Sequence, residues 1–191
     1  MARTRSASAH RKVLDAAIAL VAERGIEGTS MDAIAERSGV SKATIYKHWA
    51  DKEGLLLEVM SDISGLRSRP KFDSGDTRED MIAVLSHRAD EGCASWSERI
   101  MPHLVAYSAR NPSFGNAWRR MVMDPPRREL AYLLSLGIER GELAPDLDVD
   151  VALPLLLGPM LYAHIFLQRA ERNERVLAEG VVDAFWRAFG L

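Results

Sequence analysis

Apolar side chains recur every three or four residues along most of this chain, and this spacing is the feature that most limits its possible folds. Between about residues 9 and 24 they lie on one helical face, which ends at Gly25. No run of alternating apolar and polar residues is long enough to predict a strand. We therefore predict an all-α fold of about nine helices.

Two short helices joined by a glycine turn follow the first helix. Thr29 and Asp32 have the spacing of a capping box, which predicts the start of the second helix. The turn is Ser38-Gly39-Val40, where glycine can adopt the left-handed conformation that a tight turn requires. Ser41 can cap a third helix, from Lys42 to about Trp49. This pattern predicts a helix-turn-helix within an N-terminal three-helix domain.

The third helix has the length and composition of a DNA-recognition helix. Its roughly eight residues span ~12 Å, which matches the width of the DNA major groove. Ile45 and Trp49 can face the interior. The polar side chains that remain outside are Lys42, Thr44, Tyr46, Lys47 and His48. Residues 1–55 carry a small excess of Lys and Arg, whereas the rest of the chain is acidic overall, so we expect the N-terminal part to bind nucleic acid.

Residues 8–60 closely resemble the DNA-binding region of the TetR family of transcription regulators. The shared features are the glycine turn, the run Thr44-Ile45-Tyr46-Lys47-His48-Trp49 and the following Lys52. The resemblance implies phosphate contacts by Thr44, Tyr46, His48 and Lys52. It assigns base reading to Lys42 and Ala43, with Lys47 suited to either role. The predicted DNA-contacting residues are Thr29, Ser30, Ser41, Lys42, Ala43, Thr44, Tyr46, Lys47, His48 and Lys52.

The chemistry of these side chains agrees with the implied roles. Hydroxyl and imidazole groups donate to phosphate oxygens, and such contacts set the register on the duplex. Lys42 can donate to guanine O6 and N7, whereas Ala43 can meet only a thymine methyl. A flexible N-terminal arm can add phosphate or minor-groove contacts through Arg3, Arg5, Arg11 and Lys12.

The run from Arg67 to Thr77 is too rich in Pro, Gly and Ser for a helix, and we place a domain boundary at its start. Residues 1–66 form the predicted DNA-binding domain, and residues 67–191 the predicted ligand-binding and dimerisation domain. Capping boxes open helices at Thr77 and Ser95. Further helices are predicted at about residues 113–122, 126–140, 150–169 and 173–189.

The last two predicted helices are the most apolar long segments of the chain. A helix that is apolar nearly all round must be buried nearly all round, which in a small domain requires a second subunit. The residues expected at that interface are Leu153, Leu156, Leu157, Leu161 and Ile165. Residues 140–148 and 156–162 are similar to TetR-family C-terminal domains, whose closing helices pair across a two-fold axis. We therefore expect a homodimer through the last two helices, with a kink at Gly158-Pro159.

The C-terminal half is rich in aromatic and methionine side chains, which suit a pocket for an apolar or aromatic small molecule. The residues predicted to bind this effector are Trp96, Tyr107, Trp118, Met121, Tyr162 and Phe166. The predicted function is that of a repressor released from a palindromic operator by the effector, as the resemblance implies.

Other chemistry lacks a sequence signal, and we predict no cofactor and no metal. Cys93 is the only cysteine, so neither an intrachain disulfide nor a cysteine-based zinc site can form. His87 and Glu91 lie one helical turn apart, with Cys93 and His103 as further candidates, but they match no metal-site motif. No catalytic motif appears, so an enzyme is not predicted.

We expect a cytoplasmic protein without a membrane partner. Charged residues interrupt the apolar stretches before the ~18 to 20 residues of a membrane span, and the N-terminus leads into no apolar signal core. Two alternatives stay open. One is an activator, or a regulator that answers to a protein. The other is a helical small-molecule-binding protein or enzyme without DNA binding.

Overall fold

A computed structural model describes residues 2–66, 69–87, 91–167 and 173–191, and their regular structure is helical apart from one isolated bridge between Leu143 and Gly190. The predicted all-α class is confirmed. The elements are α1 (Ala2–Arg24), α2 (Met31–Ser38), α3 (Lys42–His48), α4 (Lys52–Ile63), α5 (Thr77–Ser86), α6 (Glu91–Arg110), α7 (Pro112–Trp118), η1 (Arg119–Met123), α8 (Asp124–Glu139), α9 (Val149–Tyr162), η2 (Ala163–Leu167) and α10 (Glu174–Phe189).

The π-helical turn η1 joins two helices that the sequence predicted as separate. From Pro112 to Glu139 the chain is one continuous rod, in which the Asp124 N–H donates to the Arg119 carbonyl five residues back. Pro125 and Pro126 follow directly and lack the N–H groups that an α-helix would use. The wider π turn carries the helix past this proline pair. With α9 and η2 also continuous, the described part of the chain forms nine rods, in agreement with the prediction.

The N-terminal helix is longer than predicted. α1 begins at Ala2 rather than near Ala9, because the intervening residues include no proline or glycine to stop it. The flexible arm expected at Arg3 and Arg5 is therefore part of a helix. Arg11 bonds to Asp15 and, at 2.8 Å, to Asp62 of α4, so its guanidinium already has partners within the protein.

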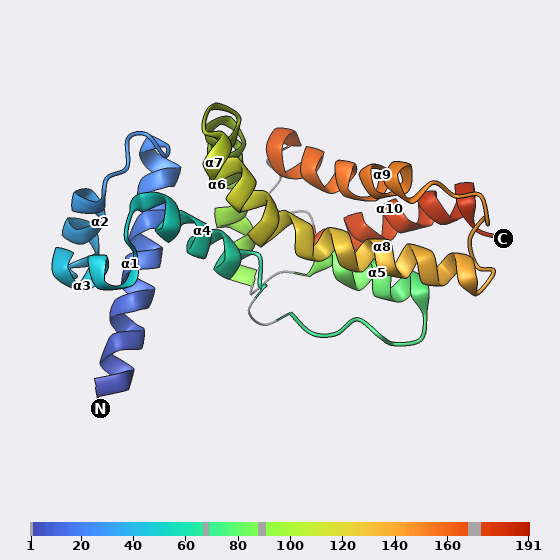
Figure 1. Cartoon of the computed structure of the whole chain (residues 1–191), viewed down its shortest axis with the longest axis horizontal. Coiled ribbons are helices and arrows are strands. Elements are labelled where there is room, and N and C mark those ends of the chain that lie inside the picture. The colour runs from blue at the N-terminus through green and yellow to red at the C-terminus, as the bar shows by residue number, and fades with distance from the viewer. Residues whose placement is uncertain (1, 67–68, 88–90, 168–172) are drawn as a thin grey trace.

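A first hydrophobic core unites the N-terminal helices with α6 and α7. Helices α1 to α3 lie at one end of the molecule, and α4, α6 and α7 lie between them and the rest (Figure 1). Besides the inner faces of α1 to α4, this core includes Ile100 and Leu104 of α6, Phe114 and Trp118 of α7, and Val122 of η1. The predicted boundary at residue 67 divides the sequence, whereas this core draws on both sides of it.

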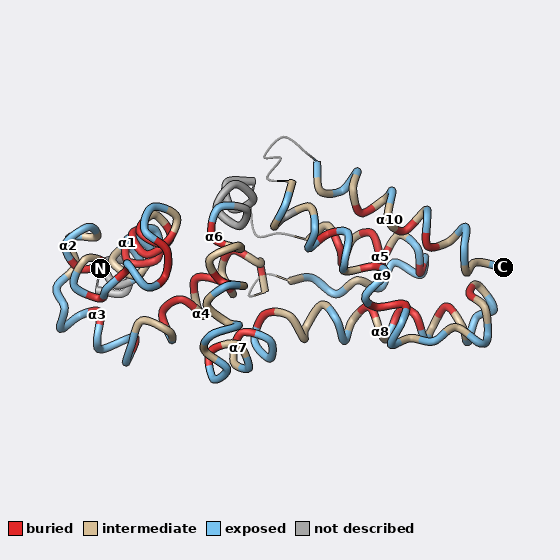
Figure 2. The backbone as a smooth tube through the Cα atoms, turned by 90° about the horizontal axis from the view of Figure 1, so that it is seen from above, coloured by how far each residue is buried: buried red, intermediate tan, exposed pale blue. Residues whose placement is uncertain are grey.

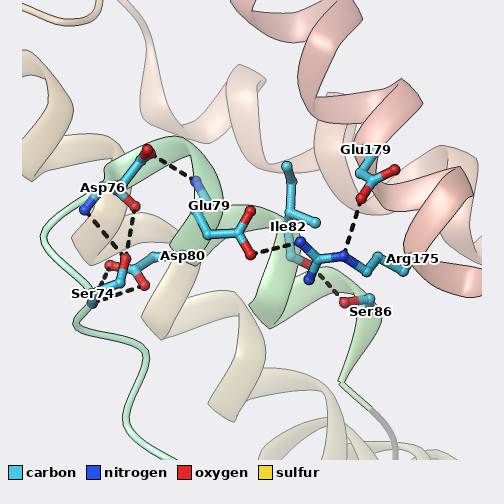
Figure 3. Close-up of polar contacts among 8 residues, drawn as sticks. All are labelled: Ser74, Asp76, Glu79, Asp80, Ile82, Ser86, Arg175 and Glu179. Carbon is cyan, nitrogen blue, oxygen red and sulfur yellow. Dashed lines mark hydrogen bonds and ion pairs between the residues drawn. The ribbon is translucent and has the colours of Figure 1, made fainter.

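A second core joins α5, α8, α9 and α10, whose buried residues line the inner faces of these helices (Figure 2). Arg175 of α10 binds Glu79 of α5 at 2.7 Å and Glu179 at 3.0 Å (Figure 3), and Arg78 pairs with Asp183 along the same contact. The C-terminus is fixed by the Ala144 N–H, which donates to the Phe189 carbonyl at 2.8 Å. The ion pairs of Arg175 and Arg78 anchor α5 on α10.

The segment Val149–Leu167, formed by α9 and η2, corrects the expectation that every apolar stretch is short. Among the described residues it is the one helix long and apolar enough to cross a membrane, by length and composition alone, and 24% of it is buried. A helix that packs in a protein core passes the same test. Because so little of this apolar segment is buried, much of it is exposed to solvent in a single chain.

The shared first core leads to a prediction about stability. Leu104→Ala removes a fully buried α6 side chain from that core and should lower the free energy of unfolding by about 2 to 5 kcal/mol. Tyr132→Ala, at an exposed position of α8, is the control and should change it by less than about 0.5 kcal/mol. Urea denaturation at a fixed protein concentration measures both values. Equal stabilities would mean that α6 adds nothing to this core.

Candidate nucleic-acid interface

Three local devices build the helix-turn-helix. Ser30 caps α2, its Oγ accepting from the Ala33 N–H at 3.1 Å. Gly39 ends α2 with φ 67°, a left-handed conformation that most side chains disfavour. Ser41 then caps α3, its Oγ accepting from the Thr44 N–H at 3.3 Å. The turn at Gly39 and the cap at Ser41 lie where the sequence indicated. The cap of α2 is Ser30 and not Thr29 of the predicted capping box, because the Thr29 hydroxyl donates to the Gly25 carbonyl instead.

The recognition helix α3 is divided into a buried face and a polar face. Ile45 and Trp49 are buried in the first core. Tyr46 is 51% exposed. The other exposed predicted contact residues of this segment are Ser41, Lys42, Ala43, Thr44, Lys47 and His48. The structure thus brings most of the predicted DNA contacts together on one outward surface.

Some of these side chains already have partners within the protein. Lys42 Nζ lies 2.8 Å from Asp32 Oδ2, and both side chains are more than half exposed. Ser41 and Thr44 share a hydrogen bond of 2.8 Å between their hydroxyls. Exposed pairs of this kind exchange with water at little cost, so a DNA phosphate or base can replace them.

Thr29 and Lys52 have structural roles that the sequence did not reveal. Thr29 is 1% exposed, and its hydroxyl donates to the Gly25 carbonyl at 2.7 Å. Lys52 Nζ donates to the carbonyls of Ile26 and Thr29, at 2.6 and 2.8 Å. Both residues donate to carbonyl groups of the turn that follows α1. Neither side chain faces outward with α3.

Arg37 is a further structural residue that the sequence reading missed. Its guanidinium on α2 binds the Glu23 carboxylate of α1 through two hydrogen bonds, of 2.6 and 2.7 Å. These hydrogen bonds lower the pKa of Glu23. Glu23 and Arg37 lie on different helices, 14 residues apart in the sequence, so no helical spacing predicts that they pair.

The structure describes the side chains of five of the six residues predicted to bind an effector, and these differ in burial. Tyr107 and Trp118 pack in or against the first core, whereas Met121 is exposed. Tyr162 and Phe166 are 56% and 68% exposed on α9 and η2, with ring centroids 5.2 Å apart. Trp96 belongs to α6, but its side chain lies outside the described residues. Tyr107 and Trp118 therefore have different surroundings from the exposed pair of Tyr162 and Phe166.

Two of these aromatic residues have distinct polar environments. The Tyr107 hydroxyl donates to Glu53 Oε1 at 2.7 Å, and this hydrogen bond raises the pKa of Tyr107 to about 12. Trp118 is 8% exposed, and its indole N–H has no hydrogen-bond partner among the described residues. A buried donor without an acceptor costs about 1 to 3 kcal/mol of folding free energy, so the Trp118 indole can gain from an acceptor that a bound molecule supplies.

No group of three His, Cys, Asp or Glu side chains within the described residues could hold a metal ion. His87, one of the metal ligands considered from the sequence, lies with Nε2 at 3.1 Å from the Gly65 carbonyl and its ring against Phe72. The side chains of Glu91 and Cys93 lie outside the described residues.

An apolar surface runs along α9 and α10, and it includes only part of the predicted set of residues: Leu161 is exposed, whereas Leu157 and Ile165 are half-buried. Leu153 and Leu156 are buried within the subunit and do not face outward. The exposed apolar residues of α9 and η2 are Val151, Leu155, Leu161, Tyr162 and Phe166. A groove of about 480 Å³ lies beside them, and its lining includes Leu155, Pro159, Val176, Gly180 and Ala184. Periodicity alone could not tell the inward face from the outward face of a helix that is apolar all round.

Comparisons with known proteins agree with this geometry. Residues 13–59 match the family model described as bacterial regulatory proteins, tetR family, and residues 72–185 match the tetracyclin repressor-like C-terminal domain. The regulator YdeS of Bacillus subtilis, an uncharacterised helix-turn-helix protein, is 30% identical over 96% of this chain and 91% of its own length. A second such regulator of that species, YvkB, is 33% identical over 88% and 87%.

Solved structures show the same fold. The TetR-family regulator PfmR of Thermus thermophilus superimposes with a TM-score of 0.64 at 23% identity, covering 92% of this chain and 97% of its own. The regulator FadR of Bacillus subtilis gives 0.69 at 20% identity, covering 92% and 96%. The two family models together span both halves of the chain, and the two relatives are similar over most of its length. The chain therefore belongs to the TetR family of bacterial transcriptional regulators.

Proposed function

We propose that this protein is a cytoplasmic homodimeric repressor that binds a palindromic operator through α3 and leaves it when an apolar small molecule binds the C-terminal half. The observation that carries the proposal is the outward face of α3, where hydroxyl, imidazole and ammonium groups project from a helix of major-groove length. Relatives named as transcriptional repressors, including KstR2 of Mycobacterium tuberculosis at 29% identity, support repression.

The side chains on α3 divide into two roles by their chemistry. Thr44, Tyr46 and His48 suit phosphate contacts, which fix the protein on the duplex without reading sequence. Lys42 lies on the first turn and can donate to a guanine once it leaves Asp32. Thr29 and Lys52 are left out of the contact surface, because their polar groups hold the loop after α1.

The division of roles predicts two different defects in DNA binding. Tyr46→Ala should weaken binding to all sequences almost uniformly, whereas Lys42→Ala should chiefly relax base preference, by about 1 to 3 kcal/mol at one base pair. Fluorescence anisotropy at matched salt measures both, with duplexes that the wild-type protein selects from the DNA upstream of its own gene. Tyr132→Ala is the control.

Two outcomes of this experiment would contradict the proposal. If Tyr46→Ala bound as tightly as the wild type, α3 would not dock as described. If the wild-type protein bound no DNA in a sequence-dependent way, the alternative of a helical ligand-binding protein or enzyme would be favoured.

The dimer is the second part of the proposal. The exposed residues Val151, Leu155, Tyr162 and Phe166 follow each other at steps of four or seven residues, so they form one stripe along α9 and η2. The outward side of α10 is lined by residues with little or no side chain, Gly180 and Ala184 among them, which lets another helix approach closely. A second copy that covers both helices would bury the large apolar area typical of obligate dimers.

A charge in this stripe should break the dimer. Leu155→Glu places a carboxylate at the edge of the groove between α9 and α10, where a partner subunit would have to bury it unpaired. We expect monomers or insoluble protein by analytical ultracentrifugation, whereas Tyr132→Glu, at an exposed position of α8, should leave a dimer. Wild-type protein that sediments as a monomer at micromolar concentration would contradict the proposal.

The third part concerns the effector. The buried indole N–H of Trp118 lacks an acceptor among the described residues, and an acceptor on a bound molecule would remove that cost. Apolar core residues, Phe114 and Val122 among them, share this region. An apolar compound that carries a carbonyl group therefore suits the region better than a sugar or a phosphate. FadR of Bacillus subtilis was solved with stearoyl-CoA, so acyl thioesters belong among the compounds to test.

An effector of this kind should lower the affinity of the protein for DNA, and DNA should lower the affinity of the protein for the effector. Tenfold release corresponds to about 1.4 kcal/mol of coupling, and linkage requires the same factor in both directions. Aryl ketones and acyl thioesters, screened by thermal shift, would be titrated with and without operator. Trp118→Phe retains an apolar aromatic ring and removes the N–H donor. It should therefore weaken the binding of carbonyl compounds several-fold. Equal affinities with and without DNA would contradict induction.

A further inference from the structure

One carboxylate joins three helices of the DNA-binding half. Glu58 of α4 accepts a hydrogen bond from the Trp49 indole N–H, with 2.7 Å between Nε1 and Oε2. Its other oxygen lies 2.9 Å from Nε2 of His10, on α1. The Glu58 side chain is 19% exposed, so most of its surface is removed from water. A partly buried carboxylate with two partners binds more strongly than an exposed surface pair.

Trp49 is the residue through which Glu58 acts on the recognition helix. It follows α3 directly, and its backbone N–H donates to the Ile45 carbonyl at 3.0 Å, which closes the last turn of that helix. A helix of seven residues is not stable alone, so contacts at its ends determine its position. Ser41 holds the first turn, and the Glu58–Trp49 hydrogen bond holds the last.

His10 extends this contact to the predicted DNA surface. Its ring lies on Trp49, with centroids 4.7 Å apart, and meets the His48 ring edge-on at 5.7 Å and 87°. A crevice of about 30 Å³ separates α1 from α3 at this point, so apolar packing there is incomplete. The polar and ring contacts of His10 therefore contribute directly to how His48 is held.

We propose that Glu58 is a positioning residue for DNA recognition. Its carboxylate does not face DNA; it fixes Trp49 and His10, and through them the end of α3 and the His48 ring. This inference rests on the proposed DNA-binding function and adds to it a residue outside α3. Nothing in the sequence marks Glu58, because its two partners lie nine residues before it and near the start of the chain.

Asp62 provides a matched control on the same helix. It also receives a hydrogen bond from α1, from Arg11 at 2.8 Å, but among the described residues this carboxylate does not bond to α3 or Trp49. Loss of either carboxylate therefore weakens the contact between α1 and α4. Only loss of Glu58 releases the end of α3.

The test compares Glu58→Ala, Glu58→Gln and Asp62→Ala by anisotropy, with a duplex that the wild-type protein selects from a random library. Glu58→Ala should weaken binding about tenfold, as expected from loss of a charge-assisted hydrogen bond that orders the recognition helix. Glu58→Gln retains an acceptor for the indole and should recover most of the affinity. Asp62→Ala should remain within about twofold of the wild type. Thermal melts verify that every variant is folded at the assay temperature.

Hydrogen exchange of the free proteins provides a second readout, independent of DNA. Glu58→Ala should lose protection at the amides of Ile45 to Trp49, whereas Asp62→Ala should keep it. Tight DNA binding by Glu58→Ala, or an equal loss in Asp62→Ala, would overturn the proposal. If the wild-type protein bound no duplex, the proposed function would fail, and the exchange data would still report whether Glu58 holds α3.

Discussion

The packing of α6 and α7 against the DNA-binding helices is the interaction on which the rest of this molecule depends. A unit of one long and two short helices buries too little apolar surface to be robust alone. Leu104 and Phe114 supply part of the missing core from the C-terminal half. Tyr107 bonds to Glu53 and Arg110 pairs with Glu27 at the same junction. A displacement of α6 therefore changes the surroundings of α1 and α4 directly.

The apolar closing helices follow a second constraint, since they serve two surfaces at once. One side of α9 buries Leu153 and Leu156 in the second core, and the other side exposes a stripe that ends in Tyr162 and Phe166. This double demand explains why the segment is as apolar as a membrane span. The ion pairs that join α5 to α10, such as that of Glu79 with Arg175, fix this surface on its subunit (Figure 3).

Polar groups in the N-terminal half are divided between holding the fold and facing outward. Lys52 and Thr29 satisfy loop carbonyls, and Glu58 satisfies an indole, whereas Tyr46 and Lys47 have their polar groups directed to solvent. Residue type does not distinguish these two uses. A lysine after a helix-turn-helix can serve as a phosphate contact or as a donor to nearby carbonyls, and the distance to those carbonyls decides between them.

The sequence by itself determined the helical class, the cap at Ser41, the turn at Gly39 and the face of α3, because these follow from interactions between residues a few positions apart. Only the tertiary structure decided the partners of Lys52 and Glu58 and the outward side of α9. It also decided that α6 shares a core with α1. Each of these features depends on contacts between segments far apart in the chain, and a periodic pattern contains no information about which distant segment covers which face.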